Sequence, residues 1–219
     1  MTKIHKAMVV AILAGGALAV PAPAQAAPTS TPSTASASLG EVDIVVGGTP
    51  AQAAPIAPCD VAGPEAGNSR GADVGTTTEY GRGETTCTRG ADGVSSAKVT
   101  GQRFETSVLR QFGGPTIRVR TYTAECQTTD NGSSGYVELG GVSGFTMPSS
   151  IPPNHSITIP SPTAGDPPMA ELVLNEFVAP TPPDGSLTTH ALHIKLFPEG
   201  GPGSGDIYVG SASCDPYGG

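Results

Sequence analysis

The stretch that decides the fold is LTTHALHIKLF, residues 187–197. Its side chains follow a period of two, which is the pattern of a half-buried β-strand. One parity holds His190, Leu192, Ile194 and Leu196, and the other holds Ala191, His193 and Lys195. Because successive side chains of a strand point to opposite faces of a sheet, residues three apart do so too. We therefore expect His190 and His193 on opposite faces.

Similar short runs recur on both sides of this stretch. Residues 116–125, TIRVRTYTAE, alternate in the same way, and turns rich in Gly, Pro and Asn separate one run from the next. The predicted strands are residues 94–99, 103–110, 116–125, 135–139, 142–147, 156–160, 170–178, 187–197 and 205–213. No comparable helical periodicity follows residue 26. This pattern predicts an all-β fold, either an antiparallel β-sandwich or a Greek-key barrel, behind a disordered N-terminal tether.

The chain begins with the pattern of a signal peptide, residues 1–26. Basic residues precede an apolar run at residues 7–20, and Ala24-Gln25-Ala26 is a small-residue cleavage site. The apolar run is shorter than the roughly 20 residues that a membrane-spanning helix needs. We expect cleavage between Ala26 and Ala27, no membrane anchor after cleavage, and a secreted, extracellular protein.

Composition divides the rest of the chain into three parts. Residues 27–58 are rich in Ala, Pro, Ser and Thr, which predicts a disordered tether, because such a segment buries too little apolar surface to offset its chain entropy. Residues 59–93 are rich in Gly and Thr, and we expect a disulfide to hold them. Residues 94–214 carry the predicted strands and form the predicted β-rich domain.

All four cysteines, Cys59, Cys87, Cys126 and Cys214, follow the signal peptide. An even number of cysteines in an exported chain predicts disulfides, whereas zinc sites usually contain close cysteine pairs. We favour Cys59–Cys87, which brackets the Gly- and Thr-rich segment, with Cys126–Cys214, which joins two strand ends. Cys87–Cys126 with Cys59–Cys214 is the competing pattern.

Charge and composition exclude several classes of protein. The formal net charge is -8, and only 14% of the residues are charged. A nucleic-acid-binding protein needs a basic face to replace the counterions of the phosphates, so we expect no nucleic-acid partner. With 30 Gly and 22 Pro and no Trp, the chain is also unlike a coiled coil or a large α/β enzyme.

The sequence carries no complete catalytic or metal-binding motif. A serine elbow of the G-x-S-x-G type is absent, and the cysteines are expected to be oxidised. Two histidines on opposite faces of a strand cannot share a metal ion, so His190 and His193 predict no metal site. We therefore assign no catalytic residue, no metal and no cofactor, and expect a protein that is not an enzyme.

Three short motifs carry a family resemblance: Leu172-Val-Leu-Asn-Glu176, Leu187-Thr-Thr-His-Ala-Leu-His-Ile194 and Asp206-Ile-Tyr-Val-Gly-Ser-Ala212. With them, residues 94–214 resemble the choice-of-anchor P family of exported bacterial proteins. The resemblance implies a signal peptide, a Pro/Thr-rich stretch and a β-rich domain, and it implies no particular reaction.

The polar residues of these motifs suggest one pair. Glu176 shares a parity with Leu172 and Leu174, so it is expected to point inward and to need a partner. A Glu176–His190 hydrogen bond across neighbouring strands would supply one. The sequence thus predicts a secreted, non-catalytic β-domain protein that binds a cell-wall component or a surface protein. The alternative is a secreted hydrolase that acts on envelope polysaccharide or peptide.

Overall fold

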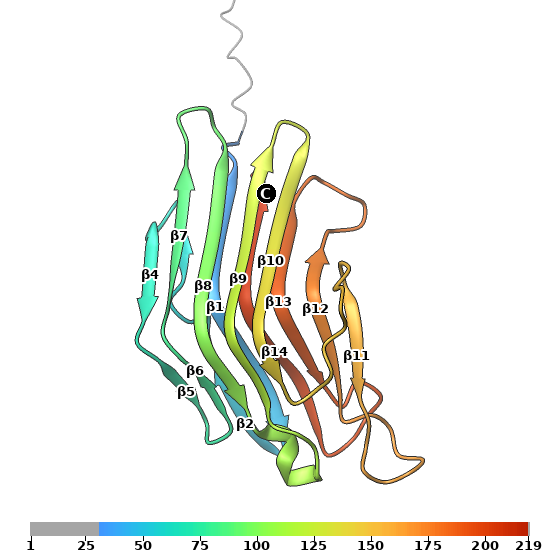
Figure 1. Ribbon diagram of the computed structural model, residues 1–219. Helices are drawn as coiled ribbons and strands as arrows, with labels where there is room; N and C mark the ends of the chain where they lie inside the picture. The colour runs from blue at the N-terminus through green and yellow to red at the C-terminus, as the bar shows by residue number, and fades with distance from the viewer. Residues whose placement is uncertain (1–30, 219) are drawn as a thin grey trace, which may run out of the picture.

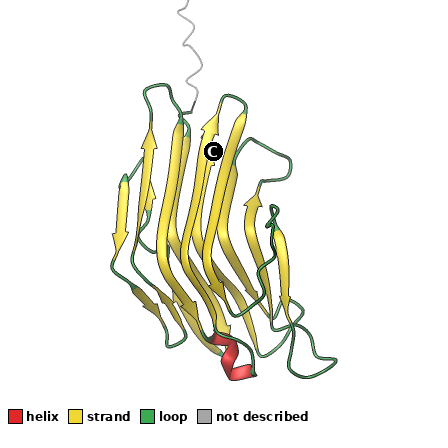
Figure 2. Ribbon diagram, in the orientation of Figure 1, coloured by secondary structure: helices red, strands yellow, loops and turns green. Residues whose placement is uncertain are grey.

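The computed structural model describes residues 31–218, which form two antiparallel sheets packed face to face (Figure 1). Figure 2 shows strands along most of this part of the chain, together with one short 3-10 helix, η1 (Val108–Phe112). The fold is an antiparallel β-sandwich, as the sequence predicts. The signal peptide, its cleavage site and the first residues of the predicted tether lie outside the described residues.

Sheet A contains the C-terminal strands and the first strands of the chain. Its order is β11-β12-β13-β14-β1-β2, and β3 also pairs with β1. The strands are β1 (Thr34–Val46), β2 (Thr49–Ala53), β3 (Cys59–Asp60), β11 (His155–Ile159), β12 (Ala170–Val178), β13 (Leu187–Leu196) and β14 (Gly203–Asp215).

Sheet B contains the middle of the chain. Its order is β10-β9-β8-β6-β5, and β7 pairs with both β8 and β4. The strands are β4 (Ala66–Ser69), β5 (Ala72–Val74), β6 (Thr78–Tyr80), β7 (Gly83–Arg89), β8 (Ser95–Thr106), β9 (Ile117–Thr129) and β10 (Gly132–Ser143). Figure 1 shows β8, β9 and β10 as long neighbouring strands in front of sheet A.

The core lies between the inner faces of the two sheets, and Tyr80 links them through it. The Tyr80 hydroxyl donates a hydrogen bond of 2.7 Å to the main-chain oxygen of Tyr208, on the opposite sheet. Burial raises the pKa of Tyr80 well above its ordinary value, so the hydroxyl keeps its proton. Gly40 leaves room for this ring, because a Cβ at that position would lie 2.3 Å from Tyr80 Cε1.

Both disulfides favoured from the sequence are present, and both join sheet A to sheet B. Cys59–Cys87 connects β3 to β7 with a Cα–Cα distance of 5.7 Å. Cys126–Cys214 connects β9 to β14 with a Cα–Cα distance of 5.6 Å. The two sheets are therefore fastened covalently at two places.

The prediction of a disordered tether is wrong for residues 34–53. These residues form β1 and β2, and β1 lies inside sheet A between β14 and β2. Composition is misleading here because Thr34-Ala-Ser-Ala-Ser38 is itself an alternating strand pattern, in which the alanines are buried and the hydroxyl side chains face outward.

Other predicted boundaries also change. The predicted strands 94–99 and 103–110 merge into β8 followed by η1, and those at 135–139 and 142–147 merge into β10. Residues 59–93 are not a separate unit held only by a disulfide. Their strand β3 pairs with β1 in sheet A, β4 to β7 belong to sheet B, and Val74 and Tyr80 are buried in the common core. One sandwich therefore runs from β1 to β14.

Halfway along the long strands, the side chains change the face to which they point. In β13 the buried inward positions are odd-numbered up to Ala191 and even-numbered from Leu192. In β1 the change falls between Leu39 and Val42. The pairing register is the same before and after this level, so no residue has been inserted.

These positions lie opposite one another across each sheet, and we call them the phase-switch row. Its members are Asn175, Ala191, Gly210 and Leu39 in sheet A, and Gly141, Arg120, Arg103 and Gly81 in sheet B. Four of them have a left-handed backbone: Asn175 (φ 52°), Gly210 (φ 63°), Gly141 (φ 63°) and Arg103 (φ 60°). A left-handed residue within a strand breaks the regular alternation and re-aims the side chains beyond it.

The position of β1 can be tested with Leu39, which is fully buried at 0% exposure. We expect Leu39→Ala to lower the free energy of unfolding by about 2–5 kcal/mol, because the residual cavity adds to the lost apolar burial. Val45→Ala, on an exposed position of the same strand, should change it by less than about 0.5 kcal/mol. Chemical denaturation measures both, and equal effects would contradict the placement of β1.

Candidate functional site

The outer face of sheet A gathers polar side chains on both sides of the phase-switch row. His190 and His193 lie on this same face, because β13 changes phase between them at Ala191. The expectation that they face opposite sides is wrong for this reason: it assumes an uninterrupted period of two. Their ring centroids are 6.1 Å apart, and the ring of Tyr208 from β14 contacts both.

His193 bridges two carboxylates. Its Nδ1 lies 3.0 Å from both carboxylate oxygens of Glu176, and its Nε2 lies 2.8 Å from Asp206 Oδ1. A neutral imidazole has only one N–H and cannot donate to both sides. The ring is therefore an imidazolium, or one of the carboxyl groups carries the proton. Tyr208 stacks on this ring at 4.2 Å, a geometry that favours a positive charge.

Glu176 is consequently held by His193 rather than by His190. Burial raises the pKa of Glu176, but its hydrogen bond with His193 and the nearby charge lower it by more, so the pKa lies below its ordinary value. His190 is the direct cross-strand neighbour of Glu176, but its Nε2 lies 4.0 Å from the carboxylate. That distance is too long for a hydrogen bond, so the predicted Glu176–His190 bond is replaced. Glu176 also lies on the outer face, not in the core.

His190 has a different environment from His193. Its Nδ1 lies 2.8 Å from Ser211 Oγ on β14, and its ring lies 4.6 Å from that of Tyr208. Burial lowers the pKa of His190 to about 4. At neutral pH this ring is uncharged, so the cluster contains one imidazole suited to charge and one that stays neutral.

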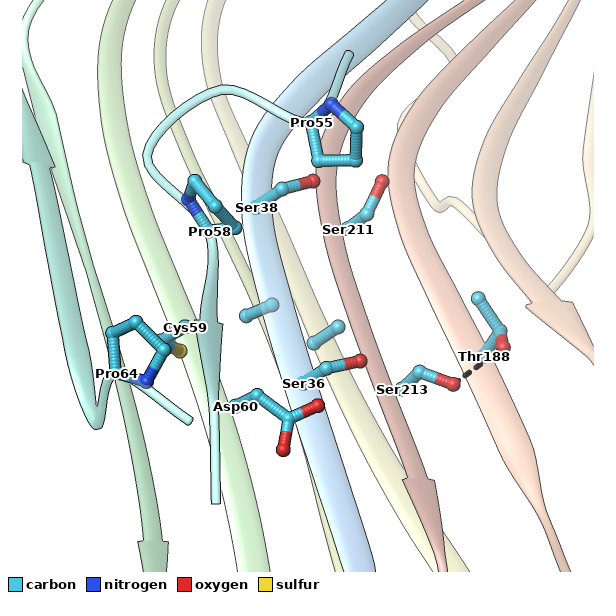
Figure 3. Close-up of a pocket in the computed structure, with 12 residues that line it drawn as sticks. Ser36, Ser38, Pro55, Pro58, Cys59, Asp60, Pro64, Thr188, Ser211 and Ser213 are labelled. Carbon is cyan, nitrogen blue, oxygen red and sulfur yellow. Dashed lines mark hydrogen bonds between the residues drawn. The ribbon is translucent and has the colours of Figure 1, made fainter. Parts of the chain in front are cut away.

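Ser211 connects this cluster to a shallow pocket on the same face (Figure 3). The pocket has a volume of about 260 Å³. Its floor consists of small and hydroxyl side chains of β1, β14 and β13, and a loop rich in proline forms one wall. The hydroxyl and carboxyl groups that line it are Ser36, Ser38, Ser211, Ser213, Thr188 and Asp60.

The lining of the pocket limits the chemistry of a ligand. The hydroxyls of Thr188 and Ser213 share a hydrogen bond of 2.8 Å, and Asp60 accepts one of 2.7 Å from the main chain of Ala62. No lysine or arginine lines this pocket, so an anion would meet no opposite charge. Hydroxyl groups can both donate and accept, and proline rings offer apolar contact. The lining therefore offers a neutral ligand some hydroxyl groups and a larger apolar surface, and it offers an anion no opposite charge.

The described part of the chain holds no group of three or more His, Cys, Asp or Glu side chains arranged to bind a metal ion. Residues 31–218 also contain no helix of the length and hydrophobicity needed to cross a membrane.

Sequence reasoning found Glu176 and His190 but missed their surroundings. His193, Asp206, Tyr208 and Ser211 join the cluster only because the strands change phase together. One signal was present in the sequence, since Gly210 interrupts the strand Asp206-Ile-Tyr-Val-Gly-Ser-Ala212, and a glycine inside a strand often marks a bulge.

Comparison of the chain with protein-family models, with curated proteins and with solved structures finds no match.

His190 predicts a specific dependence of stability on pH. The unfolded chain protonates this histidine near pH 6.5, whereas the folded chain does so only near pH 4. The contribution of neutral His190 to the free energy of unfolding is thus fully present above pH 6.5. It is lost as the pH falls toward 4, by roughly 3 kcal/mol at most. We expect His190→Gln to reduce this loss, because glutamine can still bond Ser211 but does not titrate.

Urea unfolding between pH 4 and pH 7.5 measures this effect. His155→Gln, in β11, is the matched control and should leave the dependence in place. Glu176 also contributes to acid unfolding, but because its pKa is lowered from 4.5, its contribution is lost only at lower pH. A His190→Gln profile parallel to that of the wild type would contradict the assignment.

Proposed function

We propose that the mature chain is a secreted, non-catalytic binding protein of the extracellular space or the cell envelope. The signal-peptide pattern of residues 1–26 supports export. The two disulfides between the sheets support an oxidising compartment. The proposed kinship with the choice-of-anchor P family agrees with this location and supplies no reaction.

The observation that carries the proposed binding role is the hydroxyl-lined pocket beside the His193 cluster. Its lining offers hydrogen bonds from a nearly rigid sheet, so few side chains would lose freedom when a ligand binds. The ligand class that fits is a neutral saccharide, such as a segment of a cell-wall polysaccharide. Ser211 of the pocket bonds His190, and the His190 ring contacts Tyr208. Tyr208 thus adds, close to the pocket, an aromatic ring of the kind that packs against sugars.

Binding to cell-wall material tests this proposal. Mature protein, residues 27–219, should sediment with a neutral polysaccharide fraction of cell walls. Ser36→Tyr should weaken this binding at least tenfold, because the ring would fill the pocket from its outer side without entering the core. Ser134→Tyr, at an exposed position of β10 on the other sheet, is the matched control and should bind normally. Equal binding by both variants would exclude this pocket.

A secreted hydrolase is the second candidate, and one observation favours it. Ser211 Oγ lies at hydrogen-bond distance from a neutral imidazole, His190, and opens into the pocket. A hydrolytic triad also needs a carboxylate bonded to the histidine. Glu176 lies 4.0 Å from His190 and bonds His193 instead. Strand β14 also pairs on both sides, so its main-chain N–H groups are committed to the sheet.

Covalent labelling separates the two candidates. A fluorophosphonate probe reacts with activated serines, and we expect no labelling of Ser211 in the wild type above that in Ser211→Ala. Labelling that disappears in both Ser211→Ala and His190→Gln would favour the hydrolase.

A further inference from the structure

Arginine side chains gather on the outer face of sheet B, on the side opposite the polar pocket. Arg103, Arg118 and Arg120 line one hollow of about 400 Å³ at the level of the phase-switch row. Arg82 lies one residue beyond the row, where its Nε donates to Gln102 Oε1 at 3.1 Å. In a chain with 11 basic and 19 acidic residues, this concentration of positive charge is unusual.

Two of these arginines occupy paired backbone positions of neighbouring strands. Arg103 of β8 lies opposite Arg120 of β9, between the paired residues Gln102–Thr121 and Phe104–Val119. Neither Arg103 nor Arg120 has a carboxylate within ion-pair distance in the described part of the chain. Both side chains are exposed, so their charges are available to a ligand.

Arg103 is strained as well. Its φ of 60° lies in the left-handed region, which glycine and asparagine adopt far more readily than arginine. Such outliers persist where the surrounding structure enforces them, and they cluster at functional sites. The change of side-chain phase needs a left-handed residue here but not an arginine, because asparagine or glycine fills the other left-handed positions of the row, so the choice of arginine points to another role.

The rest of the hollow positions these two guanidinium groups. The Arg120 side chain lies across Gly141, where an added Cβ would come 2.7 Å from Arg120 Cβ and 3.3 Å from its Nε. Arg118 forms a bidentate ion pair with Glu105, in which Nε and Nη2 donate to the two carboxylate oxygens at 2.8 and 2.9 Å. Glu79, the cross-strand neighbour of Glu105, completes the rim. The guanidinium groups without an ion-pair partner among the described residues are thus those of Arg103 and Arg120, and Glu79 lines the same hollow.

We propose that Arg103 and Arg120 form a binding site for an oxyanion carried on an acidic polysaccharide. Guanidinium groups bind carboxylate and phosphate oxygens through paired, charge-assisted hydrogen bonds, and these two line the hollow without an ion-pair partner among the described residues. Glu79 can accept hydrogen bonds from sugar hydroxyls next to the anion. The site is independent of the hydroxyl-lined pocket, since it lies on the other sheet.

Binding of two probes tests the site and identifies the anion. Polygalacturonate supplies carboxylates, and poly(glycerol phosphate) supplies phosphodiesters. We expect calorimetric titration of the mature protein to detect at least one of them, with affinity that falls as salt rises. Binding of one probe alone assigns the anion, and binding of both assigns a general oxyanion site. Binding of neither overturns the proposal.

Variants distinguish a binding role from a structural one. Arg103→Asn removes the charge but keeps a residue that tolerates positive φ, and Arg120→Gln removes the opposing charge. Each should weaken binding about tenfold or more, while the melting temperature stays nearly the same because both side chains are exposed. Arg110→Gln, an equal change of charge on η1, should alter neither.

Three outcomes would overturn the assignment: an equal loss of binding in Arg110→Gln, unchanged binding in both site variants, or a lower melting temperature in both. Ser36→Tyr should bind the acidic probe normally. Failure of the neutral-saccharide proposal can therefore be told apart from failure of this one.

Discussion

The simultaneous change of side-chain phase across both sheets is the constraint on which the rest of the structure depends. A sheet whose register is fixed cannot change phase in one strand alone, because a buried residue would then meet a polar neighbour. The long strands must therefore switch at the same level, as they do from Asn175 to Leu39 in sheet A and from Gly141 to Gly81 in sheet B. Left-handed backbone at Asn175, Gly210, Gly141 and Arg103 makes this possible.

The switch also explains why functional groups gather at mid-height of the sandwich. On a regular strand, His190 and His193 could not share a face, and His193 could not bridge Glu176 and Asp206 while Tyr208 contacts both rings. On sheet B the same level holds Arg103 opposite Arg120. Where the regular pattern of a strand is interrupted, side chains can converge that a pleated sheet would keep apart.

Sequence periodicity predicts the strands that have large side chains and fails where the period changes or the side chains are small. Residues 170–178 and 187–197 were predicted nearly to the residue, because Leu, Val and Ile mark their buried positions. The N-terminal half of β1 was missed because alanines occupy its buried positions and its composition of Ala, Pro, Ser and Thr is typical of disorder. The side chains that come together at the two candidate sites could not be predicted, since a phase switch depends on cross-strand neighbours. The pairing of the disulfides was predictable because Cys126 and Cys214 lie at strand ends, and because Cys59 and Cys87 bracket the Gly- and Thr-rich segment.

The two outer faces differ in charge and act independently. Glu41, Asp43 and Asp206 lie on the outer side of sheet A, where Asp43 and Asp206 are direct cross-strand neighbours, whereas Arg103 and Arg120 lie on that of sheet B. Stacked sheets are about 10 Å apart, and physiological salt screens exposed charges over about 8 Å. A charge on one face therefore has little effect on a ligand at the other. Under the two proposals above, the faces would hold a neutral and an acidic segment of one polymer at the same time, and the second contact would then benefit from the high local concentration that the first creates. Two weak sites would in this way give firm attachment to an envelope polymer that carries both kinds of segment.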